Sequence, residues 1–197
     1  EGNTPPAYSA YERFFMGWLQ PRLIVDPENV ELKELQESNE ALLISTTDQH
    51  NLIGNDPKPT TFYLLENRQQ VGWDEYLPGH GLMLTKVQYD YNKWTNNTVN
   101  NSSNRMGVDL IEADGKKPSS SSNGYTGKAG DLFPAGATEY LGITNHSIED
   151  VSEQDGIIYF KYRGGIATST EQVQTQETIV AIYNILGQKQ AAVDIES

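Results

Sequence analysis

The chain has 197 residues, enough for one domain with a small appendage and for a hydrophobic core. Its formal net charge of −13 argues against nucleic acids and anionic membrane surfaces as partners, because clustered Lys and Arg bind phosphates. The absence of cysteine excludes disulfides, thiol catalysis and cysteine metal sites. No apolar run approaches the roughly 18 residues of a membrane span.

The first predicted element is an amphipathic helix from about residue 10 to residue 19. Ser9 and Glu12 have the spacing of a capping box, in which each side chain bonds the backbone amide of the other. Apolar residues then recur at helical spacing, at Tyr11, Phe14, Phe15, Trp18 and Leu19. Pro21 ends the pattern. The large aromatic face of this helix predicts packing against the following strands or against another lobe of the protein.

Most of the remaining elements are predicted to be strands. Residues 30–35 fit a strand or a helix, and a strand is favoured because 37–40 reads as a turn into the β-rich segment 41–47. Further strands are predicted at 62–66, 82–89, 108–113 and 157–162, with loops at 48–60, 72–81, 91–105 and 115–130. The expected fold is mainly β, an antiparallel two-sheet, sandwich-like domain with one N-terminal amphipathic helix.

The composition changes after Gly164-Gly165. We expect a β domain over residues 1–165 and a polar linker rich in Gln and Thr over 166–178. A small tail follows over 179–197. Its alternating apolar residues predict a strand at 179–185 and a second strand after Gln188.

Two charged residues mark the end of the 62–66 strand. Glu66 ends an apolar run, so its carboxylate is expected to be partly buried and to need a cation. Arg68 lies on the same strand face, and Arg105 is the alternative partner. A structural ion pair is the favoured interpretation. Contact with a substrate or calcium binding is the alternative.

Two other groups are candidate sites. His80 stands between two glycines, where a backbone-bonded histidine is more common than a zinc ligand or an acid–base catalyst. Glu112, Asp114 and Asp131 are candidate calcium ligands, because carboxylates at a strand end can bind calcium with carbonyls and water. A solvated acidic surface is the more common role for such residues.

Several segments carry a family resemblance: YSAYERFFMGWLQP from Tyr8, ENR from Glu66, GWD from Gly72, PGHG from Pro78 and VDLIEADG from Val108. These segments resemble the immune inhibitor A family of secreted zinc metallopeptidases. The zinc-binding His-Glu-x-x-His of that family is absent here. No two of His50, His80 and His146 are three or four residues apart, so no helix can present a histidine pair to zinc.

The resemblance implies that this chain is the non-catalytic C-terminal portion of such a peptidase, after the zinc motif, and that it is inactive alone. It would support the active-site cleft, with an upstream catalytic lobe and protein substrates as partners. Zinc is then expected only in a longer parent, and calcium to support the fold. Residues implied to be structural or to contact substrate are Glu66, Arg68, Trp73, His80 and Trp94.

One departure from the family keeps other interpretations open. Family members often have Trp-His-Ile-Asp where this chain has Thr-Lys-Val-Gln at 85–88, which favours a degenerate, non-proteolytic homologue. A rival hypothesis is an exported β-sandwich that binds protein or glycan through exposed aromatics such as Trp73, Trp94 and Tyr91. A structural accessory domain is the third.

The tail carries a second, shorter resemblance. Residues 180–188 are similar to the opening strand of the C-terminal sorting domains that Bacteroidetes use for type IX secretion. The later motif of that domain is missing. Together with the first resemblance, this similarity implies a secreted or cell-surface protein.

Overall fold

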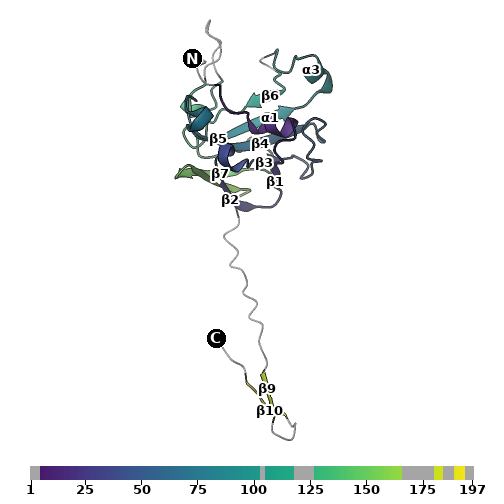
Figure 1. The fold of residues 1–197 in the computed structure, drawn as a ribbon, viewed down its shortest axis with the longest axis vertical. Coiled ribbons are helices and arrows are strands. Elements are labelled where there is room, and N and C mark those ends of the chain that lie inside the picture. The colour runs from purple at the N-terminus through teal and green to yellow at the C-terminus, as the bar shows by residue number, and fades with distance from the viewer. Residues whose placement is uncertain (1–4, 103–104, 118–126, 166–179, 184–188, 194–197) are drawn as a thin grey trace. The chain divides into compact units, whose positions relative to one another are not determined.

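The computed structural model describes residues 5–102, 105–117, 127–165, 180–183 and 189–193 (Figure 1). The chain divides into two compact units, Glu1–Ala167 and Thr168–Ser197. No helix within the described residues is long and apolar enough to cross a membrane.

The larger sheet of the first unit has five strands in the order β1-β3-β4-β5-β6. Its strands are β1 (Arg22–Leu23), β3 (Leu42–Ile44), β4 (Thr61–Arg68), β5 (Gly81–Gln88) and β6 (Val108–Leu110). All neighbours are antiparallel except β1 and β3, which are parallel. The longest pairing joins β4 to β5, with Thr61 opposite Gln88 and Arg68 opposite Gly81.

The smaller sheet has three strands in the order β2-β8-β7, and both pairs are antiparallel. The strands are β2 (Glu28–Leu32), β7 (Ile148–Gln154) and β8 (Ile157–Tyr162). The pairing of β7 with β8 is irregular between Glu149 and Ser152. A bulge of this kind is typical of an edge strand.

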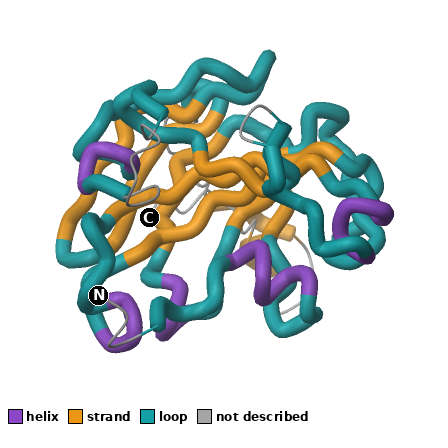
Figure 2. The backbone as a smooth tube through the Cα atoms, turned by 90° about the horizontal axis from the view of Figure 1, so that it is seen from above, coloured by secondary structure: helices purple, strands orange, loops and turns teal. Residues whose placement is uncertain are grey.

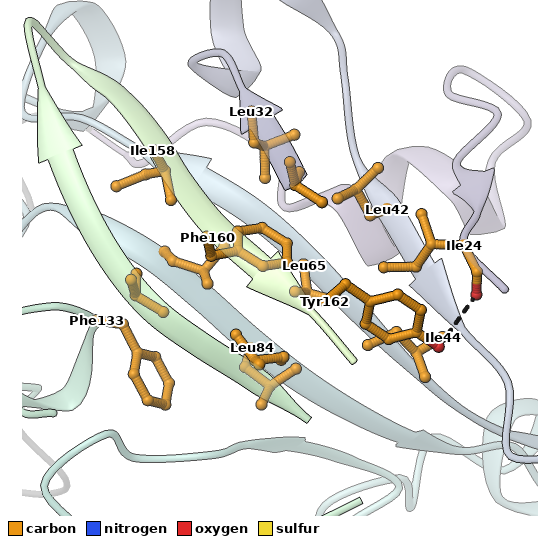
Figure 3. Packing of buried hydrophobic residues seen from close by; sticks show 14 of the residues in the cluster. Ile24, Leu32, Leu42, Ile44, Leu65, Leu84, Phe133, Ile158, Phe160 and Tyr162 are labelled. Atoms are coloured by element: carbon orange, nitrogen blue, oxygen red, sulfur yellow. Dashed lines mark hydrogen bonds between the residues drawn. The ribbon is translucent and has the colours of Figure 1, made fainter. Parts of the chain in front are cut away.

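The main hydrophobic core contains residues from both sheets (Figure 3). Figure 3 labels ten of its members: Ile24, Leu32, Leu42, Ile44, Leu65, Leu84, Phe133, Ile158, Phe160 and Tyr162. Tyr162 is fully buried, and its hydroxyl donates to the carbonyl of Ile24 over 3.3 Å. This shared core makes the two sheets a sandwich-like pair, so the predicted mainly β, antiparallel fold is confirmed.

A second core lies on the other face of the larger sheet, against α1 (Ala10–Phe15). Ala10, Tyr11 and Phe14 of the helix are buried there with Phe62 and Leu64 of β4. Figure 2 shows the short helices around the outside of the strands. The central strand β4 is therefore covered on both faces, which explains why seven of its eight residues are buried.

Helix α1 begins as predicted but ends early. Ser9 and Glu12 form the capping box, with the Ser9 amide donating to Glu12 Oε2 over 2.7 Å. The helix stops at Phe15 rather than near Leu19 because Gly17 has a φ of +74°, which a continuing helix does not allow. The amide of Trp18 then closes the turn on the Arg13 carbonyl over 2.8 Å.

Other elements also differ from the predictions. The segment 30–35 is a strand only to Leu32, because α2 (Leu35–Ser38) begins three residues later with Glu34 as its N-cap. The predicted loop 91–105 contains α3 (Tyr91–Thr95), which Asp90 caps. Strand β7 was not expected, because its sequence IEDVSEQ is polar at most positions.

The second unit is described at two strands only. β9 (Val180–Tyr183) pairs antiparallel with β10 (Lys189–Val193), with Val180 opposite Val193. These strands fall within the predicted strand at 179–185 and after Gln188. The predicted linker at 166–178 lies outside the described residues, and the division into three segments stays a prediction.

Candidate functional site

Three charged side chains are buried together at the end of β4. Arg68 Nη1 donates to Glu66 Oε1 over 3.1 Å, and Arg68 Nη2 donates to Asp74 Oδ1 over 2.7 Å. None of the three side chains is more than 5% exposed. Asp74 comes from the 3₁₀ helix η1 (Gly72–Asp74), which follows β4 in the chain. Of the two arginines considered for Glu66, the partner is therefore Arg68. We call these three residues the charge cluster.

The charge cluster binds the backbone of the N-terminal segment. Ala7 donates its amide to Asp74 Oδ1 over 2.9 Å and accepts from Arg68 Nη2 at its carbonyl over 3.1 Å. Glu66 Oε2 accepts from the amide of Ala10 over 2.6 Å. That amide is one of the first in α1, which have no partner within a helix. The cluster thus fixes both the path of the chain before α1 and the start of α1.

The charges of this cluster are not fully compensated. Burial raises the pKa of Glu66, while the Arg68 guanidinium and the Ala10 amide act in the opposite direction. Within the described part of the chain, Arg68 Nε and Asp74 Oδ2 are buried without a hydrogen-bond partner. Such a network costs desolvation energy and stabilises little on balance. The contacts of the charge cluster with Ala7 and Ala10 show that it holds the backbone of the N-terminal segment in place.

An open cavity of about 600 Å³ adjoins the charge cluster. Three large rings line it, from Tyr8, Trp18 and Trp73, and they are 60%, 55% and 61% exposed. Tyr8 and Trp18 meet edge to face, with their ring centroids 5.5 Å apart. The other lining residues are Pro5, Pro6, Ala7, Arg13 and Asn39. We call this cavity the aromatic cup. So many exposed aromatic atoms in one hollow are typical of a binding surface.

Of the rings in the aromatic cup, the sequence pointed only to Trp73. Helical spacing places Trp18 in the apolar stripe of a longer helix, but Gly17 ends the helix and leaves the Trp18 ring exposed. Tyr8 precedes the helix and belongs to no periodic pattern. Gly17 in the expected last turn was the signal that could have shown both the early helix end and the exposed ring.

Trp94 belongs to a different place. Its ring packs against Tyr89 with centroids 4.8 Å apart and against Tyr11 at 6.2 Å, at the margin of the second core. A Cβ atom at Gly107 would lie 2.8 Å from this ring, so the chain passes close against it. Burial raises the pKa of Tyr11, its neighbour. Trp94 therefore serves packing, and it is not part of the aromatic cup.

His80 pairs with a carboxylate from the other sheet. Its Nδ1 atom lies 3.0 Å from each carboxylate oxygen of Glu153, near the end of β7. The His80 side chain is half exposed, and it lines a cavity of about 340 Å³ with Pro134. Gly81 has a φ of +130°, and a Cβ there would overlap the Phe133 carbonyl. This pair links the two sheets at the start of β5.

The other two histidines are held by bonds inside the fold. His146 Nδ1 lies 2.6 Å from the Tyr162 hydroxyl. His50 Nδ1 accepts from the amide of Leu52 over 2.9 Å. Burial lowers the pKa of both imidazoles, which favours their neutral forms.

The three candidate calcium ligands have contacts of their own. Asp131 Oδ2 accepts from the Lys128 amide and Asp114 Oδ1 from the Lys116 amide, each over 2.8 Å. Glu112 is partly buried and accepts from the Gly115 amide through its backbone carbonyl. In the described ranges, no group of three or more His, Asp or Glu side chains is arranged to hold a metal ion. Calcium at these residues stays a prediction.

Comparisons with protein-family models, with curated proteins and with solved structures find no match to this chain. The resemblance to the immune inhibitor A family therefore rests on the sequence motifs alone.

Proposed function

We propose that this chain is the non-catalytic C-terminal portion of a secreted immune inhibitor A-like zinc metallopeptidase, in which it supports the active-site cleft. Its partner is then the upstream catalytic lobe of the same protein, and protein substrates contact both parts. Zinc belongs to that lobe, and calcium supports the fold. The expected location is outside the cell or on its surface, which the short resemblance of residues 180–188 to a type IX sorting strand also favours.

One observation carries this proposal. Three of the segments that resemble the family meet in the charge cluster, and Ala10 in the first of them lies 56 residues before Glu66 in the sequence. The segment at Tyr8 to Pro21 supplies the Ala10 amide, ENR supplies Glu66 and Arg68, and GWD supplies Asp74. We expect these segments to meet if they form one scaffold that the chain shares with the family. A buried charge is tolerated only beside its partners, so the residues of such a network are kept together.

The test uses the product of the complete gene beside the chain described above. We expect a His-Glu-x-x-His sequence upstream of Glu1, about one zinc per molecule by mass spectrometry, and hydrolysis of a denatured protein substrate. We expect no hydrolysis by residues 1–197 alone. A complete product without the motif and without zinc would refute the proposal.

The supporting role has its own variant pair in that longer product. Arg68→Ala removes the cation of the charge cluster, and Arg22→Ala removes the cation of an exposed pair with Glu28, 2.8 Å apart. We expect Arg68→Ala to lower hydrolysis well below the wild-type rate and Arg22→Ala to leave it unchanged. Equal effects of the two variants would show that the charge cluster does not support the cleft.

The aromatic cup favours a second function, an exported module that binds protein or glycan. Of the exposed rings expected for such a module, Trp73 lies in the cup, whereas Trp94 is packed in the second core. Residues 85–88 lie in β5, where Lys86 and Gln88 replace the polar His and Asp of the family, and this replacement favours a degenerate homologue. Ligand binding by a complete product that lacks zinc would favour this module, or a degenerate homologue, over a peptidase.

A further inference from the structure

One wall of the aromatic cup is tied together by hydrogen bonds. Arg13 Nε donates to the Tyr8 carbonyl over 3.0 Å, and its Nη1 donates to Asn39 Oδ1 over 2.9 Å. Asn39 Nδ2 in turn donates to the Trp18 carbonyl over 2.9 Å. The backbone under both rings is thereby joined to one guanidinium. Nη1 also reaches the Leu35 carbonyl over 3.0 Å, which anchors this wall to α2.

The backbone around the third ring, Trp73, is held as firmly. Gln36 accepts from the Trp73 amide at Oε1 over 3.2 Å and donates from Nε2 to the Val71 carbonyl over 2.9 Å. Ala7, which also lines the cup, has both backbone groups bonded to Arg68 and Asp74. The rings are therefore exposed but their backbones are fixed. A preorganised cavity of this kind binds ligand with little cost of ordering.

The charge of the cup differs from that of the chain. Arg13 is the one charged side chain among the described lining residues, in a protein with a net charge of −13. Its charge also lowers the pKa of Glu66, but both oxygens of that carboxylate are bonded to Ala10 and Arg68. Among the described residues, Arg13 forms no salt bridge and its Nη2 no hydrogen bond. The cup thus offers an arginine that can take a carboxylate.

The polar groups of the cup argue against a sugar. A sugar ring presents many hydroxyls, which need side-chain acceptors as well as donors. The side chain of Asn39 is bonded at both ends, to Arg13 through Oδ1 and to the Trp18 carbonyl through Nδ2. The remaining lining side chains are apolar apart from the Tyr8 hydroxyl, the Arg13 guanidinium and the indole N–H donors of Trp18 and Trp73, so side-chain acceptors are scarce. This combination suits an apolar group joined to a single anion.

We propose that the aromatic cup binds the C-terminal end of a peptide. The last side chain is apolar and lies among the rings of Tyr8, Trp18 and Trp73, and the terminal carboxylate pairs with Arg13. A cavity of about 600 Å³ accommodates a few residues. Peptide binding in the cup does not depend on the peptidase proposal, because every group that would bind the peptide belongs to the first unit of this chain and none belongs to a zinc site or a catalytic lobe.

The test measures binding to the full 197-residue chain by calorimetry and by the indole signals of its tryptophans in nuclear magnetic resonance. The probe is acetyl-Ala-Ala-Phe with a free carboxylate, and the matched control is the same peptide as its C-terminal amide. We expect the acid to bind at least about tenfold more tightly than the amide, since only the acid makes a charge-assisted bond. We expect the indole signals of Trp18 and Trp73 to shift and that of Trp94 to stay.

Two variants locate the site. Trp73→Ala removes a ring that is 61% exposed, so the fold should persist while affinity falls about tenfold or more. Tyr76→Ala removes a nearby ring that is 68% exposed and does not line the cup, so affinity should not change. Arg13→Met, with folding checked by circular dichroism, should abolish the preference for acid over amide.

Other outcomes overturn the proposal. Equal affinity for acid and amide, or no binding of either at millimolar peptide, rules out a carboxylate site. Binding of oligosaccharides instead of the peptide makes the cup a glycan site. Self-association in sedimentation that Trp73→Ala abolishes would show that a second copy of the chain fills the cup.

Discussion

The two faces of β4 differ in chemistry although they belong to one strand. Toward the smaller sheet, Tyr63 and Leu65 enter the apolar core shared by the two sheets. Toward α1, Leu64 is apolar, but the strand then ends in buried Glu66 and Arg68. Tyr63 and Leu65 stabilise by area removed from water. The charged face toward α1 adds little net stability. Its hydrogen bonds are directional, so it fixes the positions of Ala7 and Ala10.

The largest effect should come from breaking the charged face. Arg68→Ala leaves Glu66 and Asp74 as buried carboxylates without a cation, which should lower the free energy of unfolding by about 3–5 kcal/mol. Urea denaturation followed by circular dichroism measures this loss. The matched Arg22→Ala, at an exposed pair, should change stability by less than about 1 kcal/mol. A loss below that level for Arg68→Ala would show that the cluster is solvated in solution.

A cavity in the apolar face should reduce stability nearly as much, but it should leave the N-terminal segment in place. Leu65→Ala creates a cavity at a fully buried site between the sheets and should cost about 2–5 kcal/mol. Because the charge cluster is untouched, hydrogen exchange at Ala7 and Ala10 should keep its protection relative to the rest of the fold. Arg68→Ala should reduce that protection selectively. If both variants lose it equally, the two faces do not have separate roles.

A histidine, His146, bonds to Tyr162 of the apolar core. His146→Asn removes the 2.6 Å bond to the Tyr162 hydroxyl and should cost about 1–3 kcal/mol near neutral pH. Burial lowers the pKa of His146 below its ordinary 6.5, with the Arg163 charge acting in the same sense and the Asp48 carboxylate opposing both. Between the folded pKa and pH 6.5, His146 therefore binds more protons in the unfolded chain than in the folded one.

The sign of the pH effect follows from that difference. The contribution of His146 is fully present above pH 6.5 and is lost as the pH falls from there through the folded pKa. His50, whose pKa burial also lowers, acts in the same direction. Unfolding measured from pH 7.5 to 5 should show a shallower slope for His146→Asn than for wild type. An unchanged slope would assign the acid sensitivity to other groups.

The smallest effect concerns the helix that the charge cluster positions. Ser9→Ala removes the capping hydroxyl of α1 and should cost about 1 kcal/mol. The Glu66 carboxylate still accepts from the Ala10 amide, so the start of the helix should not move. Thermal unfolding measures the loss. A cost equal to that of Arg68→Ala would mean that the capping box, and not the cluster, fixes the segment.

Local rules predicted the parts of the fold that depend on neighbouring residues. The capping box at Ser9 and Glu12 marked the start of α1, and the two-residue strand period placed Arg68 beside Glu66. Strand β7 escaped prediction because it is an edge strand, and its stability comes from pairing with β8, which no local pattern shows.

The site needed information from the whole fold. Asp74 joins the charge cluster because η1 folds back on β4, and the aromatic cup exists because Gly17 exposes Trp18 near Trp73. Sequence spacing relates residues within one element and gives no relation between elements. Single aromatic residues were therefore identifiable as candidates, but their gathering around Arg13 was not.

The anchoring of Ala7 and Ala10 through backbone atoms constrains chain length more than residue type. The bonds run from the side chains of Glu66, Arg68 and Asp74 to amide and carbonyl groups that every residue except proline possesses. Many substitutions between the two anchors can therefore accumulate as long as the backbone keeps its course. A single inserted or deleted residue cannot, because it would pull one anchor out of reach of its carboxylate. Among descendants of this sequence, the number of residues from 7 to 10 should change later than the residue types between them.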